Sequence, residues 1–375
     1  MIYLDHAATT PLRPEVAAAM APFGADRFGN PSGGHRLARD ARRALEEARD
    51  AVAAHLGADP AGVIFTGGGT EADNLAVFGV ARGAPVVVCS AIEHPAVREA
   101  CRAAADRTCE VPVDPGGVLD LDALDAVLDE HPDVALVSVM AANHEVGTVQ
   151  PVSGVVEVVR RRAPGAVVHS DAVQAAGWLD VAWVTEGADL VSVSAHKLGG
   201  PKGVGALAVR HGVRVAPVLY GGGQEQGRRS GTQDVAGAVG LAAALDAVAR
   251  SRAQQSARVT ALRDRLADGL VATVPGCTES AERSSVLPGH CHVCFEGVEN
   301  EELLVLLDAA GVCASGGASC SSGALEPSRV LGAMGVPAAR ARGAVRFTLG
   351  HTTSGSDVDR TVAAVASAVA HLRAA

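Results

Sequence analysis

Short apolar segments alternate with helical stretches along the first two thirds of this chain. Residues 37–56 place apolar side chains at helical spacing with charges between them, and Gly57 follows as a C-cap. The apolar segments read as buried strands, and they lie at residues 63–65, 85–89, 134–139, 166–169, 190–193 and 205–209. Apolar strands that alternate with helices predict an α/β fold, in which helices cover both faces of a mostly parallel sheet.

The pattern changes after about residue 249. A long arginine-rich helix is predicted over 259–270, strands near 292–295 and 345–349, and a terminal helix over 358–372. We therefore expect a large domain of residues 14–249 and a smaller α+β domain that combines residues 1–13 with 250–375.

Composition excludes several classes of protein. The chain has 375 residues, of which 48% are hydrophobic and 20% charged, so a large core is expected rather than disorder. Its formal charge of -10 argues against direct, tight nucleic-acid binding. No apolar run reaches the roughly 18 residues of a membrane span, and Met1 to Thr10 lacks a signal pattern, which predicts a cytoplasmic protein.

Lysine is rare in this sequence. Lys197 and Lys202 are the only two lysines among 32 basic residues. Arginine stays protonated in proteins, whereas lysine can lose its proton and form a Schiff base. A chain that otherwise uses arginine would keep lysine where arginine cannot serve, although chance retention explains a surface lysine equally well.

A glycine-rich turn, Gly67 to Thr70, lies between a predicted strand and the start of the next helix. Free backbone N–H groups and the helix dipole favour an anion at such a place, which suits a phosphate. The turn lacks the Gly-Lys-Ser/Thr ending of a nucleotide-binding loop, so a nucleotide-binding protein is disfavoured.

Polar residues follow three further strands of the predicted sheet. They are His94, Asp171, Gln174, Ser194, His196 and Lys197. Ligands of open α/β sheets bind beyond the carboxyl ends of the strands, so these side chains are expected to share one site with the phosphate cradle. A phosphate, a basic ring nitrogen and an aldehyde are combined in pyridoxal phosphate, with lysine as the aldehyde's partner.

The sequence resembles the cysteine desulfurases of the long-loop NifS/IscS-like group, within the class-V aminotransferases and fold-type I pyridoxal-phosphate enzymes. The resemblance runs nearly end to end, and it implies a large domain with a mostly parallel seven-stranded sheet. Its markers are residues 3–11 (YLDHAATTP), 28–31 (FGNP), 66–74 (TGGGTEADN), 194–197 (SAHK), 229–232 (RSGT), 315–328 (SGGASCSSGALEPS) and 345–350 (VRFTLG).

The resemblance implies a role for each cofactor-binding residue. Lys197 would hold pyridoxal phosphate as a Schiff base and move the Cα proton of the substrate. Asp171 would keep the ring nitrogen protonated, Gln174 would bond the ring hydroxyl, and His94 would stack on the ring and take part in proton transfer. The implied phosphate contacts are Gly69, Thr70, Ser194 and His196, together with Thr232 from the second subunit of a homodimer.

The resemblance also implies the substrate contacts and the nucleophile. Arg346 would clamp the carboxylate of L-cysteine, a task suited to guanidinium, and Asn30 is a further implied substrate contact. Cys320 matches the family's nucleophile, which receives the substrate sulfur as a persulfide. A buried packing role fits Cys320 badly, because it lies in a run of Gly, Ser and Ala.

Three points on metal and cofactor contacts stay open in the sequence. Cys291 and Cys294 have C-x-x-C spacing, but on a strand positions i and i+3 face opposite sides, and we predict no certain metal ligand. Whether Cys320 transiently binds an iron–sulfur cluster is left open. The family usually has Asn where this chain has His144, so the expected contact to the ring oxygen would come from an imidazole.

The function expected from the resemblance is conversion of L-cysteine to L-alanine, with transfer of sulfur through Cys320 to a protein acceptor. Iron–sulfur assembly and thiolation of tRNA or DNA are all open destinations. The alternatives are a selenocysteine lyase or related lyase, and a sulfur-carrier subunit with little turnover of its own.

Overall fold

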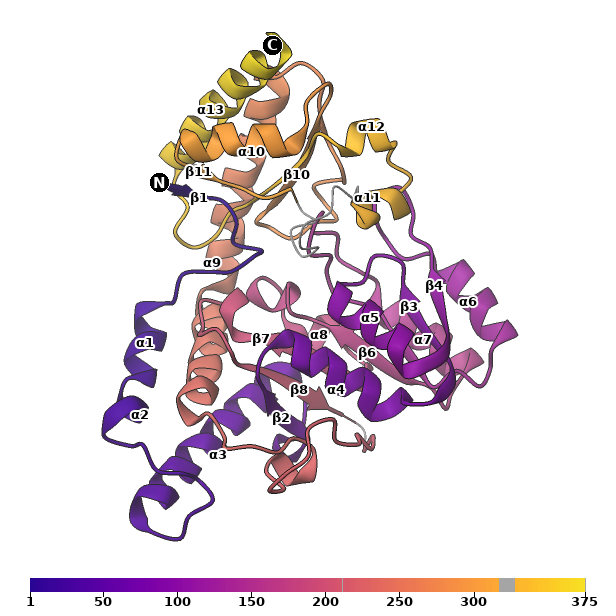
Figure 1. Ribbon diagram of the computed structural model, residues 1–375, viewed down its shortest axis with the longest axis vertical. Helices are drawn as coiled ribbons and strands as arrows, with labels where there is room; N and C mark the ends of the chain where they lie inside the picture. Colours follow the sequence, from indigo (N-terminus) through magenta and orange to yellow (C-terminus); the bar gives the residue numbers. More distant parts are fainter. Residues whose placement is uncertain (211, 317–327, 375) are drawn as a thin grey trace.

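The computed structural model describes residues 1–210, 212–316 and 328–374. Figure 1 shows a lower part built around a large sheet and an upper part that contains both termini. Helix α9 (Val235–Thr273) runs through both parts. The candidate site described below is built where the two parts meet.

The large sheet has seven strands and is mostly parallel, as predicted. In spatial order they are β2 (Val63–Thr66), β8 (Gly205–Val209), β7 (Leu190–Ser194), β6 (Val167–Asp171), β5 (Leu136–Ser138), β3 (Ala84–Ser90) and β4 (Ala105–Val111). Strand β8 runs antiparallel to both β2 and β7, and the other neighbouring strands are parallel to each other. All six predicted strands are present, and β4 is the additional one.

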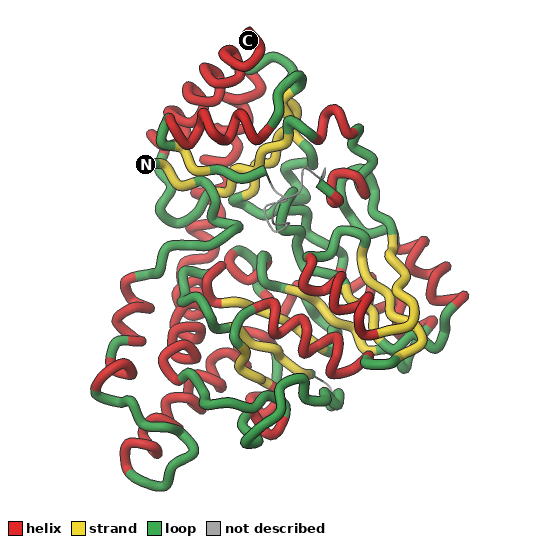
Figure 2. The backbone as a smooth tube through the Cα atoms, in the orientation of Figure 1, coloured by secondary structure: helices red, strands yellow, loops and turns green. Residues whose placement is uncertain are grey.

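Alternate residues of β3 explain why both faces of the sheet are covered. Val86 and Val88 pack into the largest hydrophobic cluster, whereas Val87 and Cys89 pack into a separate cluster on the opposite face. Helices therefore cover both faces, as Figure 2 shows. The helices of the lower part are α3 (Arg36–Leu56), α4 (Gly69–Ala81), α5 (Pro95–Ala104), α6 (Leu121–Glu130), α7 (Val152–Arg162) and α8 (Val181–Val184).

Helix α3 follows the prediction closely. It ends at Leu56, and Gly57 takes the left-handed conformation that an αL C-cap requires. Two short helices, α1 (Pro14–Met20) and α2 (Pro22–Ala25), precede it, and α1 packs against α9. Short 3-10 turns occur at Pro60–Gly62, Ala175–Gly177, Ala195–Lys197 and Glu225–Gly227.

Besides the second half of α9, the described residues of the upper part form two small sheets and four helices. Its strands are β1 (Ile2–Tyr3), β11 (Val312–Cys313), β9 (Cys277–Glu279), β10 (His290–Phe295) and β12 (Ala344–Thr348). Strand β1 pairs with β11, and β10 pairs with both β12 and β9. The helices are α10 (Asn300–Ala309), α11 (Arg329–Ala333), α12 (Ala338–Ala341) and α13 (Gly355–Ala374).

Helix α9 contributes to two hydrophobic clusters. Its first half, with Leu241 and Leu245, packs in the cluster of the large sheet, whereas Leu266 and Leu270 pack with the upper part. Ile2 also packs in the upper cluster. The division of the chain near residue 249 stays a prediction, since one continuous helix crosses that point. Within the described residues, no helix is both long and apolar enough to cross a membrane.

Candidate active site

The carboxyl ends of neighbouring strands place most of the predicted site residues along one edge of the large sheet. Asp171 is the last residue of β6, and Ser194 is the last residue of β7. Lys197 ends the 3-10 turn that follows Ser194. His94 follows β3 and caps α5, with its Nδ1 accepting a hydrogen bond from the N–H of Ala96 at 3.1 Å. The sequence correctly placed these residues at strand ends.

Lys197 reaches a turn near the N-terminus of the chain. Its Nζ donates to the carbonyl oxygen of Ala8 at 2.9 Å and also to that of Ala7. Gln174 Nε2 donates to the same Ala7 carbonyl at 2.9 Å. The turn is closed by the carbonyl of Asp5, which accepts from the Ala8 N–H at 3.0 Å. Two predicted site residues therefore meet on one backbone turn.

Asp171 is a buried carboxylate with a single N–H donor from its own turn, the backbone of Val173 at 2.8 Å. Burial raises the pKa of Asp171 to about 6, while the Val173 N–H and the charge of Lys197 act against that rise. A carboxyl whose pKa lies near neutrality, held beside a lysine, is suited to sharing a proton with a ring nitrogen.

The glycine-rich turn lies against Ser194 at the start of α4, and the two together form a candidate phosphate cradle. A Cβ at Gly69 would lie 3.0 Å from Val173 Cγ2 and 3.4 Å from Ser194 Cβ, so the backbone comes close to Ser194 only because residue 69 is glycine. Ser194 Oγ is buried and has no hydrogen-bond partner within the described chain. The N-terminus of α4 begins at Gly69. An orphaned hydroxyl at a helix N-terminus fits the phosphate of the implied pyridoxal phosphate.

A second contact fixes the same cradle from outside. Glu71 accepts from the N–H of Gly67 at 2.7 Å and from Arg229 Nε at 2.7 Å. Arg229 belongs to the segment that carries Thr232, so this ion pair ties that segment to the cradle. His196, the other predicted phosphate contact, lies with its Nδ1 3.2 Å from Thr9 Oγ1, and Thr70 is exposed at the start of α4.

His94 and His144 pack against each other, with ring centroids 5.0 Å apart and ring planes at 77°. Burial and the charge of Lys197 lower the pKa of His94 to about 4. Burial, and to a smaller extent the neighbouring His94, lower the pKa of His144. Both imidazoles are therefore neutral near pH 7. His144 Nδ1 is buried without a partner among the described residues, so it is free to bond a ligand oxygen.

Arg346 lies on β12 at the border of the two parts and is only 4% exposed. Its Nη2 donates to Asp5 Oδ1 at 2.8 Å, and its Nη1 donates to the carbonyl of His144 at 2.7 Å. Its Nε has no partner in the part of the chain that the structure describes. A buried guanidinium with an unused donor is equipped to bind a carboxylate.

Three predicted site residues do not join this constellation within one described chain. Asn30 is exposed between α2 and α3, where its Oδ1 accepts from the N–H of Ser32. Thr232 is also exposed, as a residue that serves a second subunit would have to be. Cys320 lies outside the described residues. The roles of these three residues stay predictions.

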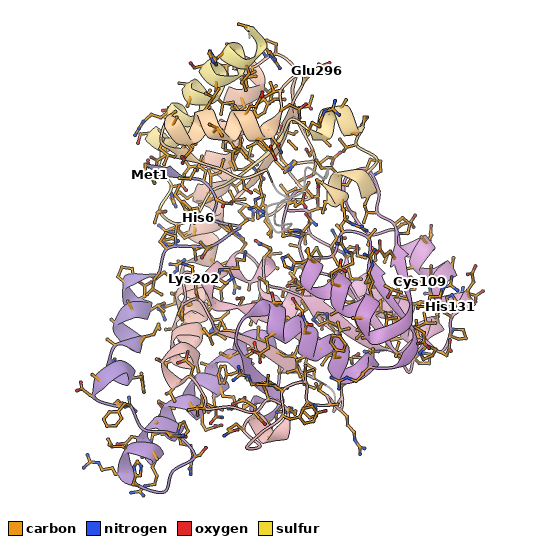
Figure 3. The ribbon with its side chains drawn as sticks, viewed as in Figure 1. Met1, His6, Cys109, His131, Lys202 and Glu296 are labelled. Carbon is orange, nitrogen blue, oxygen red and sulfur yellow. The ribbon has the colours of Figure 1, made fainter. Side chains whose placement is uncertain are left out.

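Several residues of the site were not singled out by the sequence reasoning. Asp5, which binds Arg346, belongs to the 3–11 motif but was not given a role there. His6 lies beside the same turn, between the two parts of the molecule in Figure 3. Glu145 lies where the two parts meet and accepts a hydrogen bond from Ser328 Oγ at 2.5 Å. Asp5 and His6 could have been indicated only by their positions inside the 3–11 motif, and Glu145 only by its place next to His144.

The cysteines at 291 and 294 behave as the strand geometry predicts. Cys291 packs in the main cluster of the upper part, whereas Cys294 packs in a different cluster with Met140. Their side chains therefore leave β10 on opposite faces. Burial raises the pKa of Cys291 above its usual range, so its thiol stays protonated.

The sequence matches the family described as aminotransferase class-V over residues 2–361. An IscS-like cysteine desulfurase of Mycobacterium tuberculosis is 44% identical over 387 residues, which cover 100% of this chain and 98% of that protein. A cysteine desulfurase of Cereibacter sphaeroides is 43% identical and covers 100% of this chain and 97% of its own length.

Solved structures resemble the whole chain as well. A NifS-like protein has a TM-score of 0.92 at 34% identity, and the match covers 99% of each chain. SspA in complex with cysteine has a TM-score of 0.79 at 30% identity and covers 93% of this chain and 99% of that one. The similarity therefore extends over both parts of the molecule.

Proposed function

The chain belongs to the class-V aminotransferase family and is a cysteine desulfurase, and from this premise we propose how its residues divide the work. The reaction converts L-cysteine to L-alanine and leaves the sulfur on Cys320 as a persulfide. Support for the division of roles comes from one observation: Lys197, Asp171 and the Ser194–Gly69 cradle lie together at one edge of the sheet.

We propose pyridoxal phosphate as the cofactor. Ser194, His196, Gly69 and Thr70 would hold its phosphate, and Asp171 would hold a proton at its ring nitrogen. When bound, the cofactor supplies an electron sink beside the substrate Cα. The orphaned Ser194 hydroxyl and the unpartnered Nδ1 of His144 are the two buried atoms that support this assignment.

Lys197 is the proposed base at the substrate Cα. Its Nζ is already held close to the edge of the sheet by the carbonyls of Ala7 and Ala8. His94 is neutral in the resting site because burial and the charge of Lys197 lower its pKa, and from this uncharged state it would take part in proton transfer. Arg346 would bind the substrate carboxylate and thereby fix the direction in which the cysteine thiol points.

The sulfur-transfer step balances without any added oxidant. The thiolate of Cys320 attacks the substrate sulfur, an S–S bond forms and the Cβ–S bond breaks. The electron pair of the broken bond stays with the carbon skeleton, which takes up a proton at Cβ and leaves as L-alanine. The acceptor of the persulfide sulfur is proposed to be a protein, in iron–sulfur assembly or in thiolation of tRNA or DNA.

The proposed assembly is a homodimer in the cytoplasm, with Thr232 of each subunit reaching the phosphate held by the other. The exposure of Thr232, which leaves it accessible to a second subunit, supports this arrangement. Analytical ultracentrifugation of the enzyme with its cofactor bound, combined with an activity assay, tests the proposed dimer. A monomer that retains full activity would contradict the dimer.

The two lysines provide a matched test of the central role. Lys197→Ala should abolish both the cofactor's absorbance band and alanine release from L-cysteine, whereas Lys202→Ala should retain both. Lys202 is exposed in the loop after the site, so it controls for loss of a nearby positive charge. Retention of the band in Lys197→Ala, or its loss in Lys202→Ala, would overturn the assignment.

A second candidate activity, the cleavage of selenocysteine, would take place in the same site. Cleavage of selenocysteine would use the same lysine and arginine, and comparison of initial rates with L-cysteine and L-selenocysteine distinguishes the two. Turnover of L-cysteine by the isolated protein separates either enzyme from a sulfur-carrier subunit with little activity of its own.

A further inference from the structure

Arg346 is held by two acceptors that come from opposite parts of the molecule. Asp5, on the N-terminal segment, accepts from Nη2 at 2.8 Å, and the carbonyl of His144, which follows β5, accepts from Nη1 at 2.7 Å. The guanidinium is 4% exposed, and its Nε–H has no partner among the described residues. A buried guanidinium has five N–H donors, so this one has donors left for a ligand beyond the two bonds to Asp5 and His144.

The position of Asp5 is set by the backbone rather than by its side chain. Asp5 forms a parallel bridge with Thr348, two residues beyond Arg346 on the same strand. The N–H of Thr348 donates to the carbonyl of Leu4 at 2.7 Å, and the N–H of His6 donates to the carbonyl of Thr348 at 3.2 Å. Residues i and i+2 of a strand share a face, so this pairing brings the Asp5 carboxylate to the Arg346 guanidinium.

The backbone of Asp5 also carries the turn that contacts Lys197. Its carbonyl accepts from the N–H of Ala8 at 3.0 Å and from the hydroxyl of Tyr3 at 3.0 Å. The next carbonyls of the turn, those of Ala7 and Ala8, accept from Lys197 Nζ. One short segment therefore connects the proposed carboxylate-binding arginine to the proposed base.

We propose that Asp5 is a positioning residue that orients Arg346 for the substrate carboxylate and so confers preference for α-amino acids over simple amines. The inference rests on the proposed function and assigns a residue that the family motif leaves without a role. Asp5 holds one terminal nitrogen and His144 the other, which fixes the plane of the guanidinium. The donors of the guanidinium that neither acceptor uses are then held in one orientation for the substrate carboxylate.

Two carboxyl groups of the chain lie near Arg346, and only that of Asp5 contacts it directly. Glu145 lies close enough for Arg346 to lower its pKa against the rise caused by burial, and its Oε2 accepts from Ser328 Oγ at 2.5 Å. Glu145 is bonded to Ser328 instead, which leaves Asp5 as the carboxylate that accepts from Arg346, at 2.8 Å. Removal of the Asp5 charge should free the guanidinium to rotate rather than improve its binding.

The test compares two amines that differ only in the carboxylate. L-cysteine and cysteamine both carry an amine and a thiol, and their binding to the loaded enzyme is followed by the change in cofactor absorbance. A Cys320→Ser background prevents sulfur transfer during the titration. Asp5→Asn is the variant of choice because it keeps the shape of the side chain, and Asp359→Asn, which breaks an exposed pair with Arg265, is the matched control.

The expected result is a dissociation constant for L-cysteine that rises about tenfold in Asp5→Asn, with that for cysteamine changed less than about twofold. Asp359→Asn should change neither. Equal weakening of both amines, or no change in either, would overturn the proposal. If the Asp5→Asn protein does not unfold cooperatively, Asp5→Glu replaces it, because it keeps the charge but moves the carboxylate by one methylene.

Failure of the proposed function has a different signature in the same titrations. If the Cys320→Ser enzyme with Asp5 intact bound cysteamine as tightly as L-cysteine, Arg346 would not be the carboxylate clamp at all. If it prefers L-cysteine and Asp5→Asn retains that preference, the clamp stands and only the role of Asp5 fails.

Discussion

The imidazole Nε2 of His169 lies 2.9 Å from the hydroxyl oxygen of Ser192, in a buried layer beneath Asp171. The other ring nitrogen lies 2.8 Å from Ser138 Oγ, so His169 links three neighbouring strands through their side chains. Asp171 lies two residues further along β6, on the same face as His169. The carboxylate proposed to hold the ring-nitrogen proton therefore stands on a polar network that is fully enclosed.

Replacement of His169 by Phe tests this support. The ring volume is kept, but the hydroxyls of Ser138 and Ser192 lose their buried partner. We expect the free energy of unfolding to fall by about 2–4 kcal/mol and the loaded enzyme to bind its cofactor more weakly. Urea unfolding of the cofactor-free protein measures the first effect. The control is His371→Phe on the exposed face of α13, and equal stability of the two variants would contradict the prediction.

Acid should destabilise the cofactor-free protein. Burial lowers the pKa of seven histidines. The pKa falls to about 4 in His6, His94, His196 and His351. It falls to about 3 in His169, His290 and His292. Between about pH 6.5 and pH 4 the unfolded chain binds protons that the folded protein does not, so stability falls as the pH falls. A fully buried histidine such as His169 contributes up to about 1.4 kcal/mol per pH unit, and the partly exposed His196 and His351 contribute less.

Asp171 has the opposite effect on the pH dependence of folding stability. Its pKa is raised to about 6, so from pH 6 to pH 4 the folded protein binds a proton that the unfolded chain does not. Burial raises the pKa of Asp73, Glu93 and Glu145 as well, but the histidines outnumber these carboxyls. Asp171→Asn should therefore lose stability more steeply on acidification. Urea titrations from pH 7 to pH 4.5 measure both slopes, and an unchanged slope in the variant would refute this account of Asp171.

Ser328 and Glu145 form a buried contact just after the run that contains Cys320. Ser328 Oγ donates to Glu145 Oε2 at 2.5 Å, and Ser328 also accepts from the N–H of Leu331 at 3.1 Å. Ser328→Ala leaves a buried carboxylate without this donor, which should cost about 1–3 kcal/mol of stability. We expect slower sulfur transfer in a single turnover as well. Ser354→Ala at an exposed helix start is the control, and equal transfer rates in both variants would exclude a role for the contact.

The sequence predicted the sheet well because its central strands are continuous apolar runs. It missed β4 (Ala105–Val111), whose residues are partly exposed and include Asp106, Arg107 and Glu110. An edge strand is paired on one side only, so its sequence carries no continuous apolar signal. The predicted helix over 259–270 covers less than half of α9, because the alanine- and glycine-rich first half has no clear amphipathic pattern.

The site was predictable where a residue directly follows a strand and not where it depends on a distant segment. Lys197, Asp171 and Ser194 could be placed from strand ends alone. The bond from Asp5 to Arg346 spans 341 residues of sequence, and the contact between Lys197 and Ala8 spans 189. Such pairings follow from how the N-terminal segment crosses between the two parts, which no local pattern specifies.

Localisation of the transferred sulfur tests the central claim most directly. The loaded enzyme is mixed with one equivalent of L-cysteine and digested without reductant. Trypsin leaves Cys291, Cys294, Cys313 and Cys320 in one peptide, residues 284–329, so fragmentation must identify the modified residue. The account predicts one added sulfur atom on Cys320 together with an equal amount of L-alanine. Sulfur on another cysteine, or the same yield of alanine from Cys320→Ser, would contradict it.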